Sequence, residues 1–135
     1  DVFQEGFDAL ADDLQALDQR LAAVFAGMAG KPLLGSHPVY QYLARRYDLD
    51  LKSVHFEPGE NPPENAWWDL QKILAQHPAA WMLWEGEPLP ETSSTLGELG
   101  VRSVVFDPCG NAPEEGDFLS VMSENVSNLA EAFGN

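Results

Sequence analysis

The chain has 135 residues, and its 44% hydrophobic and 10% aromatic content is that of one globular domain rather than a disordered acidic tail. Its net charge of −15 repels phosphate backbones and anionic headgroups, which argues against nucleic acid or lipid surfaces as partners and leaves cations as ligands that the surface attracts. A single cysteine, Cys109, excludes an intrachain disulfide and a cysteine-rich zinc site, and no apolar run approaches membrane-spanning length.

A stripe of apolar residues, spaced alternately four and three apart, predicts a long helix over residues 1–30. Its members are Phe3, Phe7, Leu10, Leu14, Leu17, Leu21, Val24 and Met28. Gly30, followed by Lys31-Pro32, is expected to end the helix. A coiled-coil seam fits the same spacing, but an α/β pattern follows at once, which favours a helix laid across a domain. Because the chain begins inside this pattern, we expect it to be a piece of a longer protein with any export signal upstream.

From residue 31 to residue 135, short apolar runs alternate with helical patterns. Strands are expected at residues 33–34, 51–56, 80–84 and 101–106, and helices at 38–47, 64–76, 90–100 and 118–133. Ser36 is expected to cap the first of these helices, with Pro38 in its first turn. Strands this apolar, alternating with helices, predict an α/β fold: a three-layer lobe with a four-stranded parallel sheet, preceded by the long helix.

Each predicted strand delivers a side chain able to bind a divalent metal at its carboxyl end, where ligands gather in open parallel sheets. The residues are His37 after the first strand, His55 and Glu57 after the second, Glu85 and Glu87 after the third, and Asp107 after the fourth. This mixture of imidazole and carboxylate suits zinc, iron or manganese better than calcium or copper(I).

These residues also have plain structural interpretations. His37 can be a helix-cap residue, although a helix N-terminus keeps its ring neutral and able to bind a metal. Asp107 can open an ordinary turn with Pro108. Glu85 follows an apolar run and should be partly buried, so it needs a metal, a helix amide or a histidine as partner. The remaining candidates are expected to be solvated: His55, Glu57 and Glu87.

Three segments resemble a known family in order and spacing. They are GSHPVYQYLA at residues 35–44, WEGEP at 84–88 and VFDPCG at 105–110. Together with the long first helix they resemble the cluster A-I solute-binding proteins, the zinc- and manganese-binding components of ABC importers, some of which are called adhesin lipoproteins. The resemblance covers nearly the whole chain.

The resemblance implies a metal held between two lobes that are joined by a long bridging helix, with two ligands from each lobe. It makes residues 1–30 the C-terminal part of the bridging helix and residues 31–135 the C-terminal lobe. It implies His37 and Asp107 as this lobe's ligands, with Glu85 supporting the site from behind. The other two ligands, usually histidines, belong to an N-terminal lobe.

The resemblance further implies a transported cargo rather than a catalytic cofactor. Histidine at position 37 favours Zn²⁺, with Mn²⁺ as the alternative, and the partner is the permease of an ABC importer. The location implied is periplasmic or lipid-anchored and extracytoplasmic, without membrane insertion by this segment. The residues leave two alternatives open: a metal-dependent hydrolase with Glu85 as general base, and an adhesive or interaction domain without metal. No phosphate loop, dinucleotide fingerprint, HExxH or GxSxG motif is present.

Overall fold

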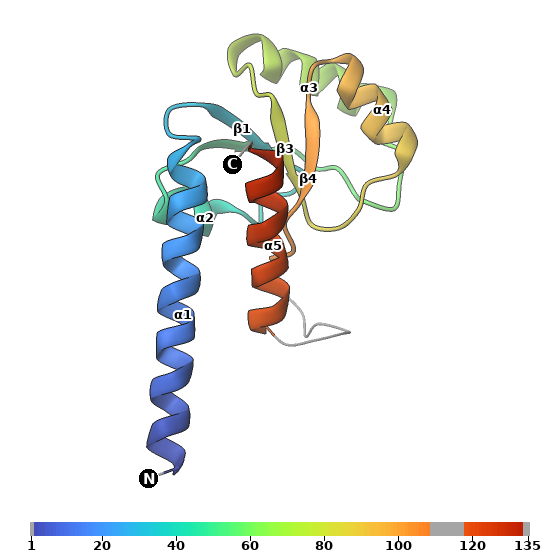
Figure 1. Ribbon diagram of the computed structural model, residues 1–135. Coiled ribbons are helices and arrows are strands. Elements are labelled where there is room, and N and C mark those ends of the chain that lie inside the picture. The colour runs from blue at the N-terminus through green and yellow to red at the C-terminus, as the bar shows by residue number, and fades with distance from the viewer. Residues whose placement is uncertain (1, 109–117, 134–135) are drawn as a thin grey trace.

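The computed structural model describes residues 2–108 and 118–133, in which a four-stranded parallel sheet lies between two helical layers (Figure 1). This confirms the predicted α/β lobe and its long first helix. The elements in chain order are α1 (Val2–Ala26), β1 (Pro32–Gly35), α2 (Gln41–Arg46), β2 (Asp50–Ser53), α3 (Glu64–Gln76), β3 (Trp81–Trp84), α4 (Pro90–Glu98), β4 (Arg102–Val105) and α5 (Phe118–Ala132). No helix within these described ranges is long and apolar enough to cross a membrane.

The strand order is β2-β1-β3-β4, and every pair is parallel. The chain therefore moves from β1 to one side to form β2, and then returns to the other side of β1 to form β3. Gly35 at the end of β1 is in register with both Ser53 of β2 and Leu83 of β3. In open α/β sheets the crevice at such a reversal point is where ligands bind, and here it lies between the carboxyl ends of β1 and β3.

Two hydrophobic cores cover the two faces of the sheet. Successive strand residues point to opposite faces, so Leu33 enters the core beneath α1, α2 and α5, whereas Leu34 enters the core beneath α3 and α4. Both side chains are fully buried. Burial on both faces explains why the central strands β1 and β3 read as continuous apolar runs rather than as alternating ones.

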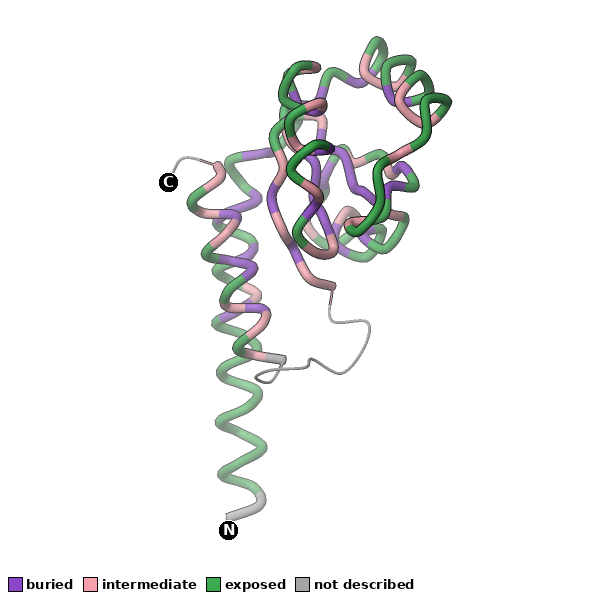
Figure 2. Tube along the Cα trace, turned by 90° about the vertical axis from the view of Figure 1, so that its right-hand side faces the viewer, coloured by how far each residue is buried: buried purple, intermediate pink, exposed green. Residues whose placement is uncertain are grey.

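Helix α1 is buried over only part of its length. Leu17, Leu21 and Phe25, in its second half, pack into the first core. Farther towards the N-terminus, Phe7 is 62% exposed and Leu14 is 41% exposed, and Figure 2 shows this half of the helix projecting beyond the sheet. The apolar stripe predicted from the sequence therefore continues on the surface, past the end of the lobe.

The start of the second helix differs from the sequence-based prediction. Helix α2 begins at Gln41, and its capping position is held by Tyr40 without a side-chain hydrogen bond, so the prediction of Ser36 as the cap is wrong. Ser36 instead extends the path of β1. Its N–H donates to the Leu83 carbonyl at 2.8 Å, and its carbonyl accepts from the Phe56 N–H at 2.7 Å. These sheet-type bonds satisfy the backbone of Ser36 and delay the helix by about one turn.

Candidate metal-binding site

His37 and Glu85 meet at the reversal point of the sheet. His37 follows β1 and Glu85 follows β3, and because these strands are neighbours their carboxyl ends deliver both side chains to one place. The imidazole Nδ1 lies 3.7 Å from the Glu85 Oε1. Both side chains are partly buried, at 22% and 32% exposed. The sequence predicted a partner for a half-buried Glu85, and the structure shows that this partner is a histidine.

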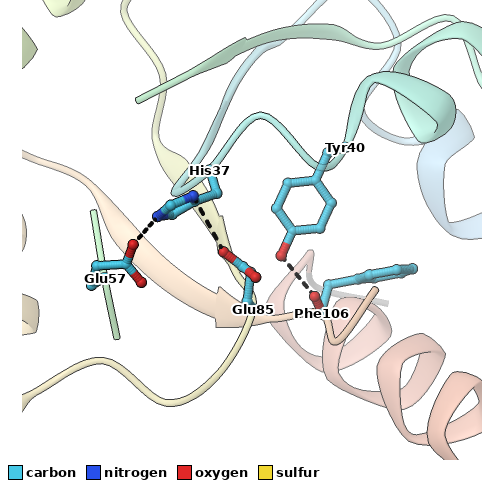
Figure 3. Close-up of polar contacts among 5 residues, drawn as sticks. All are labelled: His37, Tyr40, Glu57, Glu85 and Phe106. Atoms are coloured by element: carbon cyan, nitrogen blue, oxygen red, sulfur yellow. Dashed lines mark hydrogen bonds and ion pairs between the residues drawn. The ribbon is translucent and has the colours of Figure 1, made fainter. Parts of the chain in front are cut away.

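A second carboxylate faces the other nitrogen of the same ring. Glu57, after β2, places its Oε1 2.8 Å from the Nε2 of His37, so the imidazole lies between two carboxylates (Figure 3). The short Nε2 contact is not aligned along the N–H direction: within the described residues this buried nitrogen has no hydrogen-bond partner. A buried nitrogen without an aligned hydrogen bond is poorly satisfied, and its lone pair can bind a Lewis acid such as a metal ion.

Asp107 leaves the sheet at the end of β4, and its backbone is held by α5. Its N–H donates to the Oδ1 of Asn125 at 2.9 Å, and its carbonyl accepts from the Nδ2 of Asn125 at 2.7 Å. Asn125 is only 2% exposed, so both bonds are shielded from water. The carboxylate of Asp107 thus starts from a fixed backbone at the same edge of the sheet as His37.

Tyr40 connects the two sides of this edge. Its buried hydroxyl donates to the carbonyl of Phe106 at 2.7 Å, directly before Asp107 (Figure 3). Burial raises the pKa of Tyr40 above its ordinary value, and the negative charges of Glu85 and Asp107 raise it further. Tyr40 is therefore a neutral hydrogen-bond donor at physiological pH, and the field of both carboxylates reaches it.

The other predicted site residues differ in how close they lie to His37. His55 is exposed, and its ring lies edge-on to that of His37 with 5.8 Å between ring centroids. Glu57 was expected to be solvated; its side chain is 54% exposed but contacts His37. Glu87 is exposed and lines a separate groove beside β4, with Trp81 and Glu124. Cys109 lies outside the described residues.

Asn125 is a residue that the sequence analysis missed. Its signal was a polar residue on the apolar face of the last helix, three residues after Met122 and four before Leu129, both of which are buried. A buried amide in such a position needs partners, and these are the two backbone groups of Asp107.

The donors at this edge suit a borderline metal ion such as zinc, since imidazole nitrogen and carboxylate oxygen are among its ordinary ligands. Within residues 2–108 and 118–133, however, no three histidine, cysteine, aspartate or glutamate side chains are grouped closely enough to hold a metal ion. The described part of the chain therefore presents donors at neighbouring strand ends, with His37 at the centre, rather than a complete coordination shell.

A long helix entering a parallel α/β sheet, with a histidine and carboxylates at its carboxyl edge, is the arrangement expected from the resemblance to the cluster A-I solute-binding proteins. Residues 1–132 match the family described as zinc-uptake complex component A, periplasmic, and the chain belongs to that family. The chain is also 25% identical, over 138 residues, to the zinc-binding lipoprotein AdcA of Streptococcus pneumoniae. That alignment covers 97% of this chain and 28% of AdcA.

Solved structures share the fold. The Zn(II)-bound ZnuA-like domain of Streptococcus pneumoniae AdcA matches with a TM-score of 0.78 and 21% identity, over 98% of this chain and 52% of that one. The metal-dependent lipoprotein YcdH of Bacillus subtilis matches with a TM-score of 0.78 and 19% identity, over 96% and 51%. The laminin-binding protein Lbp of Streptococcus pyogenes matches with a TM-score of 0.67 and 16% identity, over 98% and 52%. The chain thus spans about half the length of these structures.

Proposed function

We propose that this chain is the metal-binding lobe of a solute-binding protein that captures Zn²⁺ and delivers it to the permease of an ABC importer. His37 and Asp107 act as ligands, and Glu85 supports His37. The observation that carries the proposal is the imidazole of His37 at the reversal point of the sheet, where a buried nitrogen without an aligned hydrogen bond lies among carboxylates.

Zinc chemistry makes this lobe one half of the site. Protein zinc sites are usually four-coordinate, and one imidazole with one carboxylate fills two of the four positions. The proposal therefore includes an N-terminal lobe that supplies the remaining ligands, with residues 1–30 as the end of the bridging helix and 31–135 as the C-terminal lobe. The exposed Phe7, Leu10 and Leu14 on α1 support it, since they form an apolar surface of the kind that a second lobe covers.

Glu85 is proposed to orient the ring rather than to bind the metal. Metal-bound histidines commonly donate their second N–H to a carboxylate, which fixes the tautomer and raises the basicity of the ligating nitrogen. Glu85 lies on the Nδ1 side of His37, which leaves Nε2 for the cation. This use of Glu85 also favours metal capture over hydrolysis, because a catalytic base would have to face a metal-bound water instead of the histidine.

The transported metal and the cellular location are proposed from ligand chemistry and from the descriptions of the relatives. Zinc is proposed over manganese because an imidazole ligand suits zinc, while manganese prefers carboxylate, carbonyl and water oxygens. A periplasmic or lipid-anchored extracytoplasmic location is proposed because the family is described as periplasmic and AdcA as a lipoprotein. The chain is proposed to have no catalytic activity of its own.

Competition calorimetry on the full-length protein tests this function. We expect zinc to bind more tightly than manganese, and His37→Ala to weaken zinc binding by about 100-fold or more, since even loss of an outer partner of a zinc ligand costs about 10–100-fold. His55→Ala is the matched control, because His55 is an exposed histidine beside the same ring. Equal binding by His37→Ala and the parent protein would overturn the assignment.

A further inference from the structure

Resting on the function proposed above, we propose that Glu57 is an internal competitor of the metal. Its carboxylate lies against the nitrogen of His37 that zinc would use, so zinc binding must displace it. Release of zinc would be helped by its return. Glu57 lies on the loop after β2 and is distinct from the proposed ligands His37 and Asp107.

The position of the carboxylate conflicts with a metal on the same nitrogen. The Oε1 of Glu57 lies 2.8 Å from the Nε2 of His37. A zinc ion would stand about 2.0–2.1 Å from that nitrogen, so the carboxylate oxygen must either join the metal or move away. On the proposed function, His37, Asp107 and two ligands of the other lobe fill a four-coordinate shell, which leaves no position for Glu57.

The side chain of Glu57 can rotate away from His37, while the loop that carries it is held in place. The side chain is 54% exposed, so rotation carries the carboxylate into water at little cost in solvation. The next residue, Pro58, lies against Gly86 of the loop after β3. Farther along, the Nδ2 of Asn61 donates to the Oε2 of Glu91 on α4 at 2.9 Å. The movement that zinc requires is therefore a rotation of one side chain above an anchored loop.

The contact is weak enough to be displaced. The Nε2 atom has no aligned hydrogen bond within the described residues, although Glu57 approaches it closely. Partly exposed pairs of this kind contribute little free energy, which corresponds to a change in binding of about two- to fivefold. Glu57 is thus expected to adjust the affinity and the release rate of zinc without preventing capture.

The test compares two carboxylate deletions in the full-length protein. Glu57→Ala removes the competitor, and Glu87→Ala removes the same charge from an exposed position on the adjacent loop. Zinc affinity is measured by competition with a chelator, and the dissociation rate by stopped-flow capture of the released zinc. We expect Glu57→Ala to bind zinc about two- to fivefold more tightly than Glu87→Ala and to release it more slowly.

Each outcome decides the proposal. Weaker zinc binding by Glu57→Ala than by Glu87→Ala would make Glu57 a ligand and overturn the competitor role; equal affinities and rates would overturn it as well. His37→Ala is measured in parallel. If His37→Ala binds zinc as tightly as the parent, the proposed function itself fails. If only His37→Ala has an effect, the function stands and the role of Glu57 alone is rejected.

Discussion

Asn125 binds both backbone groups of Asp107 with one side chain. Its Oδ1 accepts from the N–H at 2.9 Å, and its Nδ2 donates to the carbonyl at 2.7 Å. Asp107 lies two residues beyond the end of β4, and both of these bonds join its backbone to a buried amide on helix α5 rather than to the neighbouring strand β3. The direction in which Asp107 leaves the sheet is therefore set by helix α5.

We expect Asn125→Ala to lower both stability and metal affinity. The substitution leaves the N–H and carbonyl of Asp107 without their partner, which costs about 2 kcal/mol of unfolding free energy. The freed backbone misplaces the proposed ligand, so zinc affinity should fall by about 10–100-fold, as it does when other supporting groups of zinc ligands are removed. Urea unfolding and chelator competition measure the two effects.

Asn128→Ala is the matched control for this prediction. Asn128 is also an asparagine on α5, one turn later, and its Nδ2 donates to the carbonyl of Val105 at 3.1 Å. Its loss should reduce stability while leaving zinc affinity within about twofold, because Val105 lies two residues before Asp107. If both variants lose zinc affinity equally, the loss is caused by weaker packing of α5 as a whole and not by the two hydrogen bonds between Asn125 and Asp107.

Glu85→Gln should weaken zinc binding by about 10–100-fold, because the ring of His37 loses the charged partner beside its Nδ1. Unfolding free energy should change by less than about 0.5 kcal/mol, since the side chain is partly exposed and its 3.7 Å contact is longer than a hydrogen bond. Glu87→Gln removes an equal charge two residues away and should change affinity little. Identical affinities for the two variants would contradict the supporting role of Glu85.

The layers of this fold were predictable from the sequence because short apolar runs, typical of buried strands, alternate with the helical spacing of apolar residues. The apolar runs at Leu33-Leu34 and 82–84 are buried on both faces, and helix α3 spans residues 64–76 as predicted. Local backbone bonding was less predictable. Ser36 resembles a helix cap, yet its backbone bonds to Leu83 and Phe56, and these are partners distant in the sequence.

The candidate site was predictable only as a set of strand ends. Alternating strands and helices indicate that His37, Glu85 and Asp107 share one edge, but not which strands are neighbours. The order β2-β1-β3-β4 pairs β1 with β3 and so brings His37 to Glu85. The side-chain direction of Glu57 depends on the packing of a proline-rich loop, for which the sequence carries no periodic signal.

Gly35 is predicted to tolerate no side chain, because the ring of Tyr40 packs against it. A Cβ built on Gly35 would lie 2.9 Å from the Cδ2 of Tyr40. Gly35→Ala must shift the ring that donates to the Phe106 carbonyl, and overpacking of this kind costs about 1–3 kcal/mol. A fall in the urea midpoint measures this cost.

A glycine-to-alanine substitution in α4 should raise the stability of the protein instead of lowering it. Gly97 lies within the helix, and a Cβ there would meet no atom within 4 Å. Gly97→Ala should therefore stabilise the protein by about 0.5–1 kcal/mol through helix propensity and a less flexible unfolded chain. Destabilisation by both substitutions would show that the space around Gly35 is not the cause.

Stability at alkaline pH should depend on Tyr47, which joins α2 to α1 through Asp18. The Tyr47 hydroxyl donates to the Oδ1 of Asp18 at 2.6 Å. Burial, and next this hydrogen bond, raise the pKa of Tyr47 to about 12. An unfolded tyrosine ionises near pH 10, so the stabilisation is fully present below about pH 10 and is lost as the pH rises through about 12. Unfolding free energies from urea titrations between pH 9 and 12 should therefore fall with pH.

Tyr47→Phe separates the contribution of Tyr47 to the pH dependence of stability from the contributions of the other tyrosines. The variant should be less stable than the parent at pH 8, because it lacks the hydrogen bond to Asp18, and its stability should fall less steeply between pH 10 and 12. Tyr40, whose pKa is also raised, ionises on unfolding in both proteins and adds equally to both slopes. The difference between the slopes therefore reports Tyr47 alone. Parallel slopes would mean that Tyr47 ionises equally readily in the folded and unfolded protein, and that its hydroxyl does not keep the contact with Asp18 in solution.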